Sequence, residues 1–133
     1  MIEKEKGQMM KIKFTKTESE IVLHRLAVPD AIADAIEDRT NQPRDIIEWE
    51  AGILSQIIKG DLPGQLEWEE LSVTEQNILI DAAEGSTFFA DMDDAVACRA
   101  LSQGKALAYH RAADSLEKKL SAASGLTVRI PRW

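Results

Sequence analysis

Apolar residues recur three and four positions apart along most of the chain, which is the spacing of an amphipathic helix. The pattern is clearest over residues 44–59 and over residues 103–122. Each of these segments is followed by a glycine, Gly60 or Gly125, and glycine is the residue that most often ends a helix. The spacing therefore predicts two long helices, one in the middle of the chain and one near its end.

Residues typical of helix N-termini predict further helices along the chain. Thr17 with Glu20, and Ser72 with Glu75, have the spacing of a capping box, in which a hydroxyl and a carboxylate satisfy free backbone amides. Pro29 is suited to the first turn of another helix. Residues 86–101 are ambiguous, because they fit either a packed loop or a short helix. We expect about five helices in total.

Two short segments, residues 11–16 and 127–130, alternate polar and apolar side chains as half-buried strands do. An isolated strand would leave its backbone amides and carbonyls without partners. The simplest expectation is that these two segments pair with each other. The predicted fold class is therefore mainly α, strictly α+β, with a small two-stranded sheet formed by the N- and C-terminal strands.

The chain has 133 residues, which suits one domain. Residues 1–9 lack periodicity and are expected to be a flexible tail, so the domain would span residues 10–133. No run of apolar residues is long enough for a membrane span, and the start is too charged for a secretory signal. A single cysteine, Cys98, fits a reducing compartment. We expect a cytoplasmic protein.

The formal net charge of −7 is distributed unevenly. Residues 60–98 contain ten acidic side chains and no lysine or arginine, whereas residues 99–133 carry an excess of basic side chains. A long stretch of one sign attracts basic surfaces and repels nucleic acid; it also fits a solvated face that keeps the protein in solution. The ten acids are Asp61, Glu67, Glu69, Glu70, Glu75, Asp81, Glu84, Asp91, Asp93 and Asp94.

The tryptophans add a possible apolar anchor. Trp68 lies between Glu67 and Glu69, so its ring is either an exposed contact surrounded by acids or part of the core. Trp49 follows Ile46 by three residues and is expected in the core. The leading hypothesis is that the acidic stretch, with Trp68, docks on a basic protein.

A basic patch near the two ends is the alternative site, since the predicted strand pair would bring the ends together. Such a patch could contact nucleic acid through its phosphates. Its residues are Lys11, Lys13, Lys16, Arg129 and Arg132, with Lys118 and Lys119 of the last helix. A third possibility is a homodimer through the last helix, where Tyr109, Ala113, Leu116, Leu120 and Ala123 recur at coiled-coil spacing.

No motif for catalysis or for a cofactor is present, so we expect a protein that is not an enzyme and needs no cofactor. Asp91, Asp93 and Asp94 lack the glycine and the glutamate of a calcium loop, and helix capping explains them equally well. The two histidines have no ligand at zinc spacing, so no metal is expected. Cys98 lies among alanines and is expected to be a buried, inert thiol.

Three stretches, residues 23–33, 84–89 and 108–116, resemble small uncharacterised acidic proteins encoded by phages and prophages of Gram-negative bacteria. The resemblance covers residues 15–125 and includes no functional motif. It implies a phage accessory protein that acts inside a bacterium. With the acidic stretch, it suggests an inhibitor that blocks a nucleic-acid-handling defence complex of the anti-restriction or anti-CRISPR type.

Overall fold

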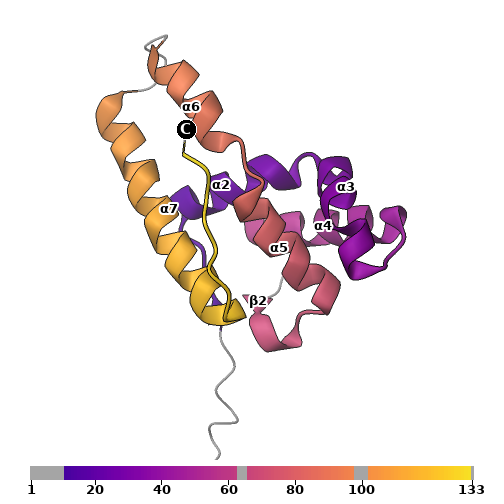
Figure 1. Cartoon of the computed structure of the whole chain (residues 1–133). Helices are drawn as coiled ribbons and strands as arrows, with labels where there is room; N and C mark the ends of the chain where they lie inside the picture. Colours follow the sequence, from indigo (N-terminus) through magenta and orange to yellow (C-terminus); the bar gives the residue numbers. More distant parts are fainter. Residues whose placement is uncertain (1–10, 63–65, 98–101, 133) are drawn as a thin grey trace, which may run out of the picture.

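Helix α2 (Lys16–Leu26) lies at the centre of the structure, where it contacts all five other α-helices. The computed structural model describes residues 11–62, 66–97 and 102–132 (Figure 1). Most of these residues are helical, as the spacing predicts. The other helices are α3 (Pro29–Thr40), α4 (Arg44–Lys59), the short 3-10 helix η1 (Trp68–Glu70), α5 (Val73–Glu84), α6 (Phe88–Ala97) and α7 (Gln103–Ser124).

The core forms where the apolar faces of these helices meet. Ile21 and Val22 of α2 are fully buried, and so are Leu116 and Leu120 of α7, which packs against α2. Together with buried Tyr109, these α7 residues form the apolar stripe that coiled-coil spacing indicated. Because α2 of the same chain covers that stripe, a homodimer through α7 would have to use other residues.

The two-stranded sheet exists, but one of its predicted strands is wrong. Strand β1 (Lys11–Ile12) pairs antiparallel with β2 (Leu66–Glu67), in the middle of the chain, and not with residues 127–130. In the register of this pair, Lys11 lies opposite Glu67 and Ile12 lies opposite Leu66.

The C-terminal segment finds its hydrogen-bond partners on α7 instead. The chain turns back at Gly125, which has a positive φ of 75°, and runs along α7 (Figure 1). The amide of Val128 donates to Ser121 Oγ at 2.9 Å, and the amide of Ile130 donates to Glu117 Oε2 at 2.7 Å. Side-chain oxygens of α7 thus accept the hydrogen bonds that the carbonyls of a neighbouring strand would accept. The side chains of Val128 and Ile130 are buried, as predicted.

Helix α2 begins two residues earlier than the predicted capping box. Thr15 is the capping residue, and its partner is Glu18 instead of Glu20. Both pairs fit the pattern, but Glu18 is 1% exposed and its Oε1 also accepts a 2.7 Å hydrogen bond from Lys119 Nζ. The tertiary contact with α7 therefore selects the register. The second box, Ser72 with Glu75, is confirmed.

Candidate functional site: an acidic surface on one half of the molecule

Helices α3, α4 and α5 pack against one another and form one half of the molecule (Figure 1). Residues 27–84, which supply this half, contain fourteen acidic and only three basic side chains. Charge is thus segregated in the fold as well as along the chain. The acidic half begins before residue 60, so the stretch identified from the sequence is only part of it.

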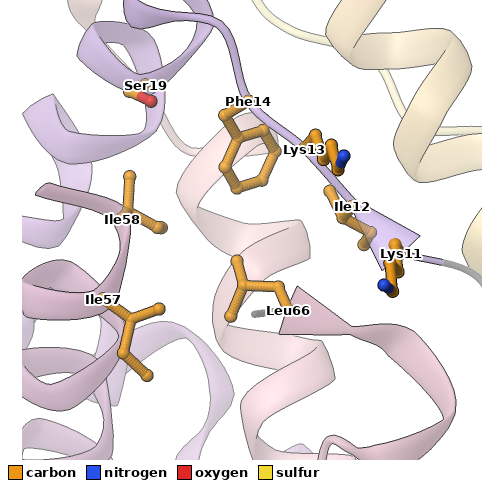
Figure 2. A pocket seen from close by; sticks show the side chains of 8 residues that line it. All are labelled: Lys11, Ile12, Lys13, Phe14, Ser19, Ile57, Ile58 and Leu66. Carbon is orange, nitrogen blue, oxygen red and sulfur yellow. The ribbon is translucent and has the colours of Figure 1, made fainter. Parts of the chain in front are cut away.

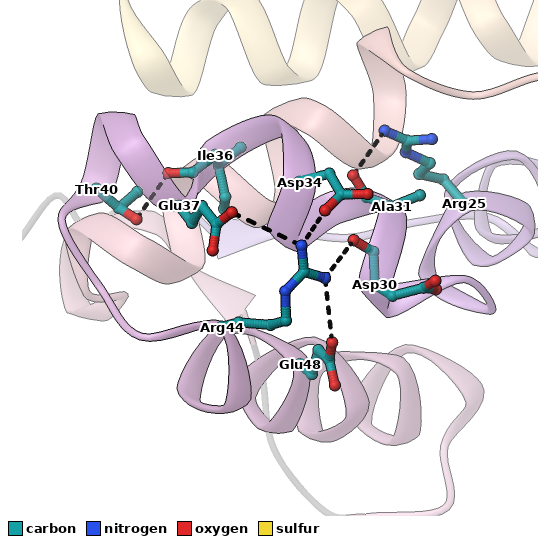
Figure 3. A network of polar contacts seen from close by, with 9 residues as sticks. All are labelled: Arg25, Asp30, Ala31, Asp34, Ile36, Glu37, Thr40, Arg44 and Glu48. Atoms are coloured by element: carbon teal, nitrogen blue, oxygen red, sulfur yellow. Dashed lines mark hydrogen bonds and ion pairs between the residues drawn. The ribbon is translucent and has the colours of Figure 1, made fainter.

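One arginine organises the carboxylates of α3 and of the first turns of α4. Arg44 forms ion pairs with Asp34 and Glu37 of α3 and with Glu48 of its own helix, and its Nη1 donates to the carbonyl of Asp30 at 3.1 Å (Figure 3). One cation faces three carboxylates here, so this corner of the molecule keeps a net negative charge.

Carboxylates stand beside other carboxylates where β2 leads into α5. A hydrogen bond and the negative charge of Glu67 raise the pKa of Glu70, while burial and the charge of Glu75 raise the pKa of Glu50. Gln76 Nε2 donates to the carbonyl of Trp68 at 2.8 Å, which holds η1 against the start of α5 and brings the two pairs into one region. We call Glu50, Glu67, Glu69, Glu70 and Glu75 the acidic surface.

Exposed apolar side chains lie on the same helices as some of these carboxylates. On α4, Ile46 precedes Trp49 by three residues and Glu50 by four, so its side chain lies between theirs on the helix surface. Trp49 is 66% exposed and Ile46 is also exposed. Val73, two residues before Glu75, is 69% exposed. Large apolar groups rimmed by charge are the composition of a protein contact surface.

The structure overturns the expectation for Trp49 and decides between the two alternatives for Trp68. Trp49 is exposed, so its predicted place in the core is wrong, and Trp68 is 6% exposed, so it is not a surface anchor. Ile47, Ala51 and Leu54 form the buried stripe of α4, and Trp49, two residues after Ile47, lies on the opposite side of the helix. The spacing of that stripe in the sequence is the signal that places Trp49 on the exposed side of the helix.

Several acids proposed for the site are placed elsewhere. Asp81 is buried and its Oδ2 accepts from Arg25 Nε at 3.1 Å. Burial raises its pKa, although the arginine opposes the shift. Asp91 Oδ2 lies 2.8 Å from His24 Nε2 on the other half of the molecule.

The remaining predicted acids lie at scattered exposed positions. Asp61 follows α4, Glu84 ends α5 and Asp93 lies on α6, each with an exposed side chain. Asp94 belongs to α6, but its side chain is outside the described part. The ten acids of residues 60–98 therefore do not form one continuous surface; those around η1 and the start of α5 do come together.

The alternative basic patch is divided between different surroundings. Arg132 is held by Asp114 and Glu117 at 2.9 and 2.8 Å, and Lys119 by Glu18. Lys118 and Arg129 border a hollow along α7. The other residues, Lys11, Lys13 and Lys16, lie around an apolar groove at the start of α2, where Lys119 Nζ also donates to the carbonyl of Lys13.

The described residues give no support to a metal site or to a membrane-spanning helix. Among them, no three histidine, cysteine, aspartate or glutamate side chains converge as a metal-ligand group would. Cys98 lies outside the described residues. None of the helices in the described ranges combines the length and the apolar composition that a membrane span requires.

No protein-family model matches the sequence, and neither a curated protein nor a solved structure matches it. The expected phage origin therefore stays a prediction.

Proposed function

We propose that this protein is a binding protein, not an enzyme, and that its acidic surface docks on a basic protein. The observation that carries the proposal is the group of carboxylates set side by side, one of which, Glu50, directly follows exposed Trp49 on α4. Like charges held close together repel each other, and a cationic partner would relieve that repulsion. Trp49 would supply the apolar contact at the centre of such an interface.

A nucleic-acid-handling protein is the partner class that suits these charges. Its groove carries lysine and arginine side chains placed to neutralise phosphates. Closely spaced carboxylates on a rigid helical frame can occupy those cationic positions in place of phosphates. Binding would then compete with nucleic acid, as expected of an inhibitor of a defence complex.

The direct test is titration of the full chain with protamine, an arginine-rich protein, at low and high salt. We expect salt-sensitive binding that the double variant Glu67→Lys/Glu70→Lys weakens by about tenfold, because four units of charge change at the contact. Trp49→Ala should weaken binding at all salt concentrations, since its contribution is apolar.

The matched control is Asp93→Lys, which reverses an exposed acid on α6, away from the acidic surface. The proposal predicts little change for this variant beyond the general effect of net charge. If Asp93→Lys and Glu67→Lys/Glu70→Lys lose the same affinity per reversed charge, the binding is non-specific electrostatic attraction and the acidic surface is not the binding site. Tight binding of duplex DNA by the unmodified chain at physiological salt would contradict the proposal.

A further inference from the structure

A second surface, distinct from the acidic one, has the opposite charge and an apolar floor. It lies between β1, the first turn of α2 and the end of α4. The hollow has a volume of about 310 Å³, which is within the size range of small-molecule sites. Figure 2 shows Phe14, Ile58 and Leu66 pointing toward one another across this space. An adjoining hollow shares Phe14, Ser19 and Ile58 with the first, and we call the two together the groove.

Lysines border this groove along its length. Lys11 and Lys13 line its first part, and Lys16 and Lys59 line its second part. Lys11 lies 4.0 Å from Glu67, but within the described ranges the side chains of the other three make no ion pair. Glu20 is the acid that lines the groove, and it already accepts a 2.8 Å hydrogen bond from the hydroxyl of Tyr109.

The segment from β1 to the start of α2, which carries Lys11, Lys13 and Lys16, forms one wall of the groove and is held in place by α7 and β2. Lys119 Nζ donates to the carbonyl of Lys13 at 2.7 Å and to buried Glu18 at 2.7 Å. The β1–β2 pair holds the other end through Ile12 and Leu66. Because this segment is fixed in the folded protein, binding does not require its ordering, which lowers the entropy cost of binding a ligand.

We propose that this lysine-rimmed groove binds a fatty carboxylate, a single alkyl chain with one anionic head group. The aliphatic and aromatic floor would hold the chain, since burying apolar surface is favourable by about 25 cal/mol per Å². The carboxylate would lie at the rim beside Lys13 and Lys16, whose charges are free to pair with it. In a chain of net charge −7, an anionic ligand is drawn to this groove because the lysines gather there.

The test is calorimetric titration of the full chain with dodecanoate, kept below its micelle concentration. We expect one-to-one binding at micromolar concentration. Dodecanol, which lacks the charge, should bind at least about tenfold more weakly, a difference of about 1.4 kcal/mol, and acetate, which lacks the chain, should not bind. Vesicles of phosphatidylglycerol distinguish a free fatty acid from a lipid surface; binding to vesicles without binding to dodecanoate would overturn the proposal.

Two variants locate the site. Lys13→Glu/Lys16→Glu should weaken dodecanoate binding by about tenfold or more, while the matched reversal Lys118→Glu/Arg129→Glu, which borders a different hollow, should leave it unchanged. Ser19→Phe should block the groove by filling it, and an unchanged thermal transition would show that the variant is folded. Equal effects of the two charge reversals, or full binding by a folded Ser19→Phe protein, would refute the site.

Discussion

The lysine-rimmed groove and the acidic surface meet at β2, and they differ in how their charges are arranged. Leu66 lines the groove, and the next residue, Glu67, belongs to the acidic surface and lies 4.0 Å from Lys11 at the rim of the groove. In the groove, cations surround an apolar hollow. On the acidic surface, carboxylates stand beside one another next to exposed apolar side chains.

The two surfaces also differ in what lies beneath them. Behind the groove, the buried carboxylate of Glu18 is paired with Lys119. Burial alone would raise the pKa of Glu18, but hydrogen bonds from Lys119 and from the Thr15 amide hold that pKa below its ordinary value of 4.5. On the acidic surface, the pKa of Glu50 and the pKa of Glu70 are raised instead. The carboxylate behind the groove is thus paired with an opposite charge, whereas Glu50 and Glu70 lie beside like charges.

The largest expected effect separates the two tryptophans of the acidic half. Trp68→Ala removes a buried ring and should lower the free energy of unfolding by about 3 kcal/mol or more. Trp49→Ala removes an exposed ring and should change it by less than about 0.5 kcal/mol. Urea denaturation measures both values. Comparable losses in the two variants would mean that Trp49 supports the fold and is not a free contact residue.

Removal of the Lys119 ammonium is the next largest effect. Lys119→Met leaves Glu18 buried without its cation and should cost about 2 kcal/mol of stability, somewhat less than a fully buried pair because the lysine side chain is 35% exposed. Lys118→Met, at an exposed neighbouring position, is the matched control and should stay within about 0.5 kcal/mol of the unmodified protein. If the control loses as much stability, the ion pair does not hold the wall of the groove.

The two regions should respond to pH in opposite directions. Glu18 has a lowered pKa in the folded protein, so its contribution is present above pH 4.5 and is lost as pH falls through the folded value. Glu50 has a raised pKa, so its effect is most favourable below pH 4.5 and is lost as pH rises through the folded value. Thermal denaturation between pH 3 and 7, roughly the range in which carboxylates titrate, measures the sum.

Variants separate these two contributions. Glu18→Gln should remove much of the loss of stability at acid pH. The resulting difference in the free energy of unfolding should be smaller than the loss caused by Lys119→Met. Glu50→Gln should remove part of the decline above pH 4.5. A Glu18→Gln protein that keeps the full acid sensitivity would assign that sensitivity to other carboxylates.

The smallest expected effect is on stability at neutral pH. Glu50→Gln relieves the repulsion with Glu75 and should raise the free energy of unfolding by less than about 0.5 kcal/mol, since the site is partly exposed and solvent screens the charges. The same variant should weaken protamine binding. Lower stability in Glu50→Gln would show that Glu50 supports the fold and is not held against a repulsion.

Local signals predicted the helices well. Ser72 and Glu75 cap α5, and Gly60 and Gly125 follow the ends of α4 and α7. Each of these signals acts within one turn of a helix, so the sequence is enough to predict it. The first capping box was misplaced because two threonine–glutamate pairs fit the same pattern, and the contact that selects one of them comes from Lys119.

Neither candidate site could be assembled from sequence alone. The acidic surface combines Glu50 of α4 with Glu75 of α5, and the groove combines Phe14 with Ile58 and Leu66. The sequence indicated carboxylates between residues 60 and 98 and lysines near the start, but not which of them would meet. Asp81 illustrates the difference: it belongs to the acidic stretch, yet it is buried against Arg25.

The amino-acid sequence by itself determined a mainly helical chain, because helix propensity and capping depend on residues close together in the chain. It also determined the uneven distribution of charge, which follows directly from the order of the residues. The tertiary structure decided which strand pairs with β1, which tryptophan is exposed and which charges are neutralised. Those outcomes depend on contacts between residues far apart in the chain. For example, the C-terminal segment bonds to Ser121 and Glu117 of α7, and that leaves β1 to pair with β2.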